Sequence, residues 1–272
     1  MRNIMERYAE SPKFFRKPLW KFWHKYLLGK DSSYDVTCLN YGYADFDGKA
    51  DLPGTEEPHI KEHFCLQLYD QVVQGVQIAN KNVLEIGGGR GGGAAYLAQK
   101  YNPASYLATD ISAHLIKQND EFYHQEELSF AVSNAEELKF PDNYFDVVIN
   151  VESSRCYTDI ESFIRHTFRV LVAGGHFCFT DLRYTVEYQN LRSAFLAQGF
   201  EIIEERNITK NVVKALQLDN ERRKTLVSEK LPKFLESSAM EFAGIKGSRR
   251  YQLFLDGEMG YYKLILRKPI PA

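Results

Sequence analysis

The sequence predicts an α/β fold in which helices cover both faces of one doubly wound, largely parallel sheet of seven strands. Two observations carry this prediction. Apolar runs of strand length alternate with amphipathic stretches of helical length from residue 59 to residue 205, and the first apolar run ends in a glycine-rich turn. Parallel neighbours in a sheet need a crossover connection, so this alternation is typical of a parallel sheet. With 272 residues, 44% of them hydrophobic, the chain can bury a substantial core.

The expected elements follow one another in a regular order. Strands are predicted where apolar and β-branched residues cluster, at Val83–Gly87, Ser105–Asp110, Leu128–Val132, Asp146–Asn150, His176–Asp181, Phe200–Glu205 and Tyr261–Leu266. Helices are predicted where apolar residues recur at helical spacing, at His59–Gln77, Gly92–Lys100, Ala113–Glu121, Ile160–Leu171 and Thr185–Gln198. A glycine turn at Gly174 and Gly175 precedes the fifth strand.

Two further helical segments bracket this core. Between Glu205 and Tyr261 apolar side chains recur at helical spacing, which predicts a helical insertion over the carboxyl edge of the sheet. Near the N-terminus a short helix is expected from Pro18 to Gly29, and its apolar stripe either packs on the core, covers a substrate site as a lid or contacts a membrane. The predicted organisation is an N-terminal extension or lid at 1–57, a core at 58–206, a helical cap at 207–257 and the last core strand at 258–272.

The glycine-rich turn from Val83 to Gly93 (VLEIGGGRGGG) indicates a nucleotide-containing cofactor, because glycine lets the backbone approach a ligand closely. Its spacing fits both the G-x-G-x-x-G of dinucleotide sites and the E-x-G-x-G-x-G of S-adenosylmethionine (SAM) sites, in which Glu85, Gly87 and Gly89 take part. Glu85 favours SAM. A carboxylate beside a pyrophosphate is repelled, whereas SAM carries an ammonium and a sulfonium and no phosphate.

Polar residues at the ends of later strands agree with this cofactor. Asp110 ends the second strand, where a carboxylate can accept hydrogen bonds from a ribose diol. Asn134 and Ala135 follow the third strand, and Asn150 ends the fourth. A NAD(P)-dependent oxidoreductase and a SAM-binding protein without catalytic activity remain as alternatives.

This ordered set of motifs resembles the class I SAM-dependent methyltransferases, whose core is a Rossmann-like sheet, over about residues 58 to 205. Segments outside the cofactor motifs are similar to the phthiotriol and phenolphthiotriol dimycocerosate O-methyltransferases, namely Leu39–Ala44, Asn150–Tyr157, Thr180–Arg183, Arg250-Tyr251 and Gly257-Glu258. The resemblance implies an antiparallel last strand and methyl transfer from SAM to a hydroxyl of a lipophilic, polyketide-derived acceptor. It also implies cofactor-binding roles for Tyr41, Tyr43, Glu85, Gly87, Gly89, Asp110, Ile111, Asn134, Ala135 and Asn150.

The chain departs from this family at the expected catalytic base. Relatives typically carry a histidine where this chain has Arg155, and a guanidinium charged at any accessible pH cannot accept the proton of a hydroxyl. Arg155 is therefore expected either to bind an anionic group of the substrate or to pair with Glu152. His63 and His59, spaced i and i+4 on one predicted helix, are the next candidates for a base. They have no evident third ligand, so no metal site is expected.

The missing histidine leaves the reaction open in other ways. An acidic hydroxyl would need little help from a base, and Glu152 or Tyr157 could take its place. Methylation of carbon or nitrogen, or an elimination or cyclisation steered by SAM as a bound cation, are the alternatives to O-methylation.

Charge and composition indicate which partners and which compartment to expect for the protein. The net charge is −2, but residues 1–30 and 206–250 each carry a net charge of +6. These basic segments indicate either solvated helix faces or peripheral contact with an anionic membrane, and without a recognisable binding module nucleic acid is not expected. There is no apolar run long enough for a transmembrane helix and no C-x-x-C pair among the four cysteines, so the expected compartment is a reducing cytoplasm.

Overall fold

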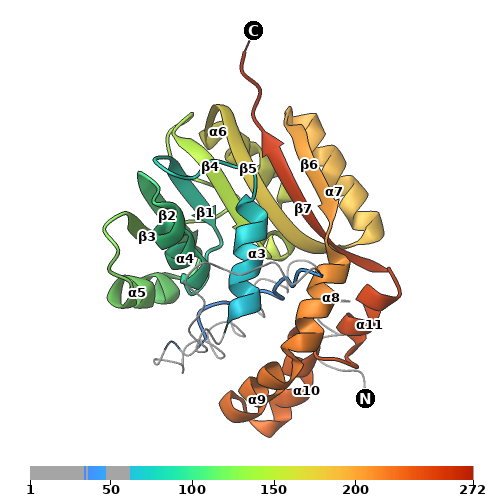
Figure 1. The fold of residues 1–272 in the computed structure, drawn as a ribbon. Helices are drawn as coiled ribbons and strands as arrows, with labels where there is room; N and C mark the ends of the chain where they lie inside the picture. The colour runs from blue at the N-terminus through green and yellow to red at the C-terminus, as the bar shows by residue number, and fades with distance from the viewer. Residues whose placement is uncertain (1–33, 35, 47–61, 272) are drawn as a thin grey trace.

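The computed structural model describes residues 34, 36–46 and 62–271, and one mixed seven-stranded sheet runs through its centre (Figure 1). The strand order is β3-β2-β1-β4-β5-β7-β6. The strands are β1 (Asn82–Ile86), β2 (Ser105–Asp110), β3 (Leu128–Val132), β4 (Phe145–Val151), β5 (Leu171–Tyr184), β6 (Glu201–Asn207) and β7 (Met259–Arg267). Strand β7 pairs antiparallel with both β5 and β6, and the other pairs are parallel. This is the predicted α/β fold.

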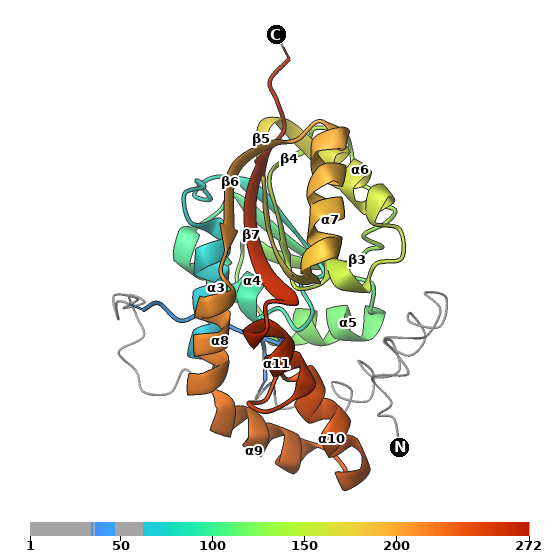
Figure 2. The ribbon, with the colours of Figure 1, turned by 90° about the vertical axis from the view of Figure 1, so that its right-hand side faces the viewer.

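Helices cover both faces of the sheet (Figures 1 and 2). On one face α3 (His63–Val73) and α4 (Gly92–Tyr101) bury Leu68 and Leu97 in a core cluster with β1 and β4. On the other face α6 (Ile160–Val170) and α7 (Thr185–Gln198) bury Phe163 and Phe195 against β5. Helix α5 (Ala113–Phe122) packs beside β2 and β3. Each crossover returns the chain to the edge where the parallel strands begin, so that these strands all end together at the opposite edge.

The largest departure from the predicted elements is in β5. This strand begins at Leu171, before the glycine turn, and continues to Tyr184, beyond the predicted end at Asp181. Its two partners explain the extra length, because Leu171 pairs with Phe145 of β4 and β7 pairs with the strand from His176 to Tyr184. The pairing of strands that lie far apart in the chain decides where such a strand ends. At the other end of the fold, α3 begins at His63, and the predicted start at His59 lies outside the described residues.

The predicted insertion between β6 and β7 is helical. It consists of α8 (Thr209–Leu218), α9 (Asn220–Lys230), α10 (Lys233–Phe242) and α11 (Arg249–Leu255), which lie beyond the carboxyl ends of the parallel strands (Figure 1). Arg223 of α9 donates to the backbone oxygen of Asn40 and pairs with Asp219, so the insertion also holds the segment 36–46. In the described ranges no helix is long and apolar enough to cross a bilayer. The predicted N-terminal helix at 18–29 lies outside these ranges.

Candidate active site

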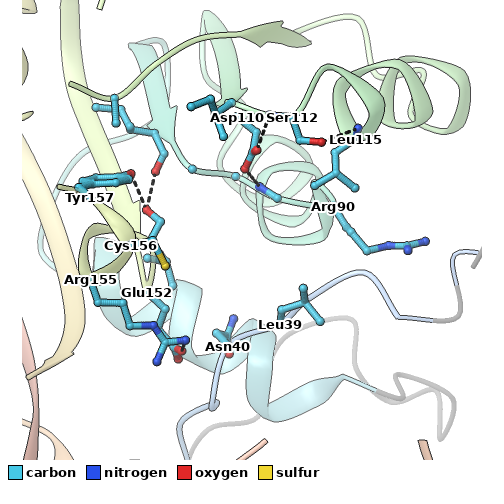
Figure 3. A pocket seen from close by; sticks show the side chains of 18 of the residues that line it. Leu39, Asn40, Arg90, Asp110, Ser112, Leu115, Glu152, Arg155, Cys156 and Tyr157 are labelled. Atoms are coloured by element: carbon cyan, nitrogen blue, oxygen red, sulfur yellow. Dashed lines mark hydrogen bonds and ion pairs between the residues drawn. The ribbon is translucent and has the colours of Figure 1, made fainter. Parts of the chain in front are cut away.

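A cavity of about 430 Å³ opens at the carboxyl edge of the sheet (Figure 3). Strands β1 and β4 are neighbours there, and the chain goes from β1 to β2 on one side and from β4 to β5 on the other, so a crevice forms between the loops that follow β1 and β4. The lining residues come from the ends of β1, β2, β3 and β4, from the segment 37–40 and from α10. They include Gly87, Gly89, Asp110, Ile111, Asn134, Ala135, Glu152 and Arg155 from the predicted site, together with Thr37, Cys38, Leu39, Asn40, Gly88, Arg90 and Phe242.

The glycine turn after β1 forms the floor of this cavity. Gly87 and Gly89 have φ values of +79° and +57°, which side-chain-bearing residues rarely adopt. A Cβ on Gly87 would lie 2.4 Å from the Oγ of Ser153, whereas a Cβ on Gly89 would meet no atom within 4 Å. The Gly87 position is therefore closed by the loop after β4. The Gly89 position is open, and a ligand can press against its bare backbone.

Asp110 stands at the end of β2 with its carboxylate at the cavity wall. Its Oδ2 accepts the Gly89 N–H at 3.2 Å and its Oδ1 accepts the Ser112 N–H at 2.9 Å. Each oxygen retains a lone pair after these bonds. The carboxylate is thus fixed in orientation and can still accept two hydroxyl donors, as a ribose diol would provide.

A flat, partly apolar wall continues from Asp110. Ile111 is 45% exposed although its side chain is large and apolar, and it lines the cavity together with Leu115. Asn134 and Ala135 line the same cavity, and the Asn134 side-chain oxygen accepts the Glu136 N–H. An exposed aliphatic face beside backbone and amide groups suits a purine ring, which offers an apolar face and a polar edge.

Glu85 lies beneath the glycine turn and does not line the cavity. Its carboxylate is fully buried and accepts hydrogen bonds from the hydroxyls of Tyr69 and Tyr106, each at 2.8 Å. Burial raises the pKa of Glu85 to about 7, while the two tyrosine hydrogen bonds act to lower it. A Cβ on Gly88 would lie 3.5 Å from the Glu85 Cδ, so one residue separates this ionisable group from the cavity floor.

Glu152, just after β4, has a strained backbone. Its φ of +49° is uncommon for a residue with a side chain. The Oε1 atom accepts the Tyr41 N–H at 2.6 Å and the Tyr261 hydroxyl at 2.5 Å, and these bonds hold the conformation. Burial raises the pKa of Glu152, and the neighbouring Arg155 acts against this rise.

Arg155 brings a positive charge to the same end of the cavity. It belongs to the short 3-10 turn η1 (Ser154–Cys156), and its guanidinium lies 5.8 and 5.5 Å from the ring centres of Tyr41 and Phe242. The Nη2 atom is 3.8 Å from Glu152 Oε2, an ion pair too long for a hydrogen bond. Among the described residues the buried Nη1 atom has no hydrogen-bond partner. The predicted pairing with Glu152 is present, and it leaves donors of Arg155 unused.

Other predicted residues lie outside the lining. The Tyr41 hydroxyl donates to the backbone oxygen of Phe242, and Tyr43 is buried nearby. Asn150 is buried beneath the glycine turn, where its amide donates to the Ile86 oxygen. His63 begins α3, where burial lowers its pKa. His59 lies outside the described residues. In the described part of the chain no group of three His, Cys, Asp or Glu residues could hold a metal ion.

Several lining residues carry no signal in the sequence. Arg90 is only 2% exposed, and its guanidinium lies 4.4 Å from the ring centre of Tyr34. Thr37 and Cys38 are held against the cavity because their N–H groups donate to the carboxylate of Glu62. The bare backbone at Gly89, the Asp110 carboxylate with a free lone pair on each oxygen, and the wall beyond it together fit an adenosine.

Comparison with known proteins agrees with this geometry. A model of the methyltransferase domain family matches residues 84–179. This chain is 32% identical to the "Probable phthiotriol/phenolphthiotriol dimycocerosates methyltransferase 2" of Mycobacterium ulcerans, and the alignment covers 85% of this chain and 89% of that protein. A fatty-acid O-methyltransferase of Mycolicibacterium smegmatis is 29% identical over 92% of this chain and 89% of its own. The [4+2]-cyclase SpnF superposes with a TM-score of 0.73 at 19% identity, covering 94% of this chain and 97% of that one.

Proposed function

The chain belongs to the SAM-dependent methyltransferase family that includes the phthiotriol/phenolphthiotriol dimycocerosates methyltransferases, and from this premise we propose that it methylates a hydroxyl oxygen of a lipophilic acceptor. The enzyme class and the cofactor, SAM, follow from the family. The acceptor and the methylated atom are the proposal. The observation that carries it is that one cavity is lined both by the Asp110 carboxylate and by Leu39, Arg155 and Phe242.

The part of the cavity at Asp110 is the proposed cofactor site. Asp110 would accept the ribose hydroxyls, Ile111 would cover one face of the adenine, and Asn134 with Ala135 would meet its edge. Gly87 and Gly89 would lie under the methionine portion, with the buried carboxylate of Glu85 below them. A negative charge beneath this turn suits a cationic ligand. Tyr41, Tyr43 and Asn150 would act indirectly, by packing behind the lining.

The other part is the proposed acceptor site. Leu39 is 41% exposed at the cavity, and Phe242 reaches it from α10, so helices of the predicted cap at 207–257 would contribute to acceptor binding. Apolar side chains at this end favour a lipophilic acceptor. The name of the relative that acts on fatty acids supports the same class.

The chain contributes alignment and exclusion of water. When bound, SAM supplies a methyl group activated by the adjacent sulfonium. The residues around the cavity hold the acceptor oxygen in line with that methyl and keep water out. A neutral alcohol must also lose a proton. Glu152 is a candidate base that lines the cavity, whereas His63 does not line it, and Arg155 cannot take a proton.

Methyl transfer is tested with SAM labelled in its methyl group. Purified enzyme is incubated with a panel of long-chain alcohols, phenols and acids, and the products are examined by mass spectrometry for a gain of one CH₂ on oxygen. Formation of S-adenosylhomocysteine (SAH) in equal amount supports the proposal. Label on carbon or nitrogen would favour the alternative methyltransferases, and acceptor conversion without SAH would favour a reaction in which SAM is only a bound cation.

A further inference from the structure

We infer that the methylated hydroxyl is that of a carboxylic acid, that this acid binds as its carboxylate with Arg155 as the counter-ion, and that the product is a methyl ester. This inference rests on the proposed O-methyl transfer and names the substrate class. It begins from the Arg155 cation, which borders the acceptor part of the cavity beside Glu152 (Figure 3). Phe242 also lies beside this cation.

The backbone of Arg155 is fixed before any ligand arrives. Its N–H donates to Asp181 Oδ2 at 3.0 Å, and the hydroxyl of Ser154 donates to the same oxygen at 2.6 Å. Asp181 is fully buried on β5 and also pairs with Arg183 at 3.0 Å. The turn η1 is therefore anchored to the sheet, and the guanidinium is presented from a rigid position.

The charges around Arg155 leave its donors available. Asp181 is balanced by Arg183, and its contact with Arg155 is made through the backbone N–H. Glu152 uses Oε1 for two other hydrogen bonds, and its Oε2 is 3.8 Å from the Arg155 Nη2. In the described part of the chain neither Glu152 Oε2 nor Arg155 Nη1 has a hydrogen-bond partner. A buried guanidinium with unused N–H groups is a site for an anion.

A carboxylate suits this cation. Its two oxygens match the planar fork of a guanidinium, and the aromatic rings of Tyr41 and Phe242 beside that fork exclude water. A long-chain acid also offers the apolar tail for which Leu39 and Phe242 provide a surface.

The same choice removes the need for a base. A carboxylate oxygen forms the new bond to the methyl carbon while the C–S bond breaks, and the electron pair of that bond goes to sulfur. The carboxylate loses its negative charge and the sulfonium its positive charge, giving a methyl ester and SAH. No proton is transferred, and Arg155 stays protonated throughout. An arginine where a base is expected is thus consistent with the reaction.

The experiment compares three probes of similar length: hexadecanoate, hexadecan-1-ol and 4-nonylphenol. Methyl transfer to hexadecanoate is expected, with methyl hexadecanoate as the product and little transfer to the alcohol. In Arg155→Gln the KM for hexadecanoate is expected to rise about tenfold or more, with the Kd for SAH within about twofold of wild type. Arg155→Lys keeps the positive charge without the planar guanidinium, so its KM for hexadecanoate is expected to lie between those of wild type and Arg155→Gln.

Arg192→Gln is the matched control, because Arg192 lies on α7, pairs with Glu205 and does not line the cavity. It is expected to leave the KM for hexadecanoate unchanged. Transfer to the alcohol or the phenol in preference to hexadecanoate overturns the inference and leaves O-methylation standing. An Arg155→Gln enzyme with an unchanged KM for hexadecanoate also overturns it. Absence of transfer to all three probes counts against both proposals.

Discussion

Replacing Asp110 with alanine tests the cofactor site at the residue whose geometry is most defined. Its carboxylate already accepts the N–H groups of Gly89 and Ser112 and retains one lone pair on each oxygen. If each oxygen accepts one ribose hydroxyl, two hydrogen bonds to the cofactor are lost in Asp110→Ala. At about 0.5–1.5 kcal/mol net for each bond, binding weakens by about 1–3 kcal/mol, which raises the Kd for SAH by about 5- to 150-fold.

Isothermal titration calorimetry with SAH, in the presence of a chelator, measures this change. Asp110→Asn, which keeps one acceptor oxygen, is expected to bind with an affinity between those of wild type and Asp110→Ala. Asp146→Ala is the matched control, because Asp146 also accepts a backbone N–H, that of Asn82 at 2.9 Å, at the opposite edge of the sheet. It lowers stability without touching the cavity. A Kd for Asp110→Ala within twofold of the control would refute the assignment of Asp110 to the ribose.

Three further predictions follow from the same geometry. Gly89→Ala and Gly75→Ala both place a Cβ at positive φ with no atom within 4 Å, so urea unfolding should show similar losses of stability, of about 1 kcal/mol. Only Gly89→Ala should weaken SAH binding in calorimetry. Equal SAH affinity in the two variants would contradict a ligand pressed against Gly89. The pKa of Glu85 is about 7 in the folded state and 4.5 in the unfolded state, so the folded state holds this proton more tightly. The free energy of unfolding should therefore fall by about 3 kcal/mol as the pH rises from 4.5 to 7. Urea unfolding at several pH values should find that slope reduced in Glu85→Gln, and an identical slope would exclude Glu85 as its source. Phe242 reaches the cavity from α10, so Phe242→Ala should raise the KM for the acceptor while the Kd for SAH in calorimetry stays within twofold of wild type. A larger loss of SAH affinity would place Phe242 in the cofactor part instead.

The sequence predicts the sheet well because most strands are rich in apolar residues and are separated by turn signals or by helical periodicity. The end of β5 is the exception, since its length depends on antiparallel pairing with β7, whose residues come about eighty positions later. The cofactor side of the site was also predictable in part. Asp110, Ile111, Asn134 and Ala135 line the cavity because strand ends of a parallel sheet converge at one edge.

The rest of the site depends on contacts between distant segments. Tyr69 and Tyr106 enclose Glu85, and neither tyrosine differs in sequence from an ordinary buried aromatic residue. Glu85 was expected beside the cofactor, and the structure shows it one residue below the cavity surface. Phe242 borders the cavity only because the insertion folds back over the strand ends. Periodicity identifies such a helix without showing what its last turn will face.

The way the loop after β4 closes the Gly87 position has a consequence for how this enzyme can change over evolutionary time. Ser153 fills the space where a Gly87 side chain would stand, so the glycine turn and the start of the acceptor wall are built as one interlocked unit of the core. Among the described residues that line the cavity, Phe242 alone comes from α8–α11. In the proposed acceptor site, substitutions in the insertion would therefore act on the acceptor through Phe242, while the core keeps the glycine turn and the loop after β4 together.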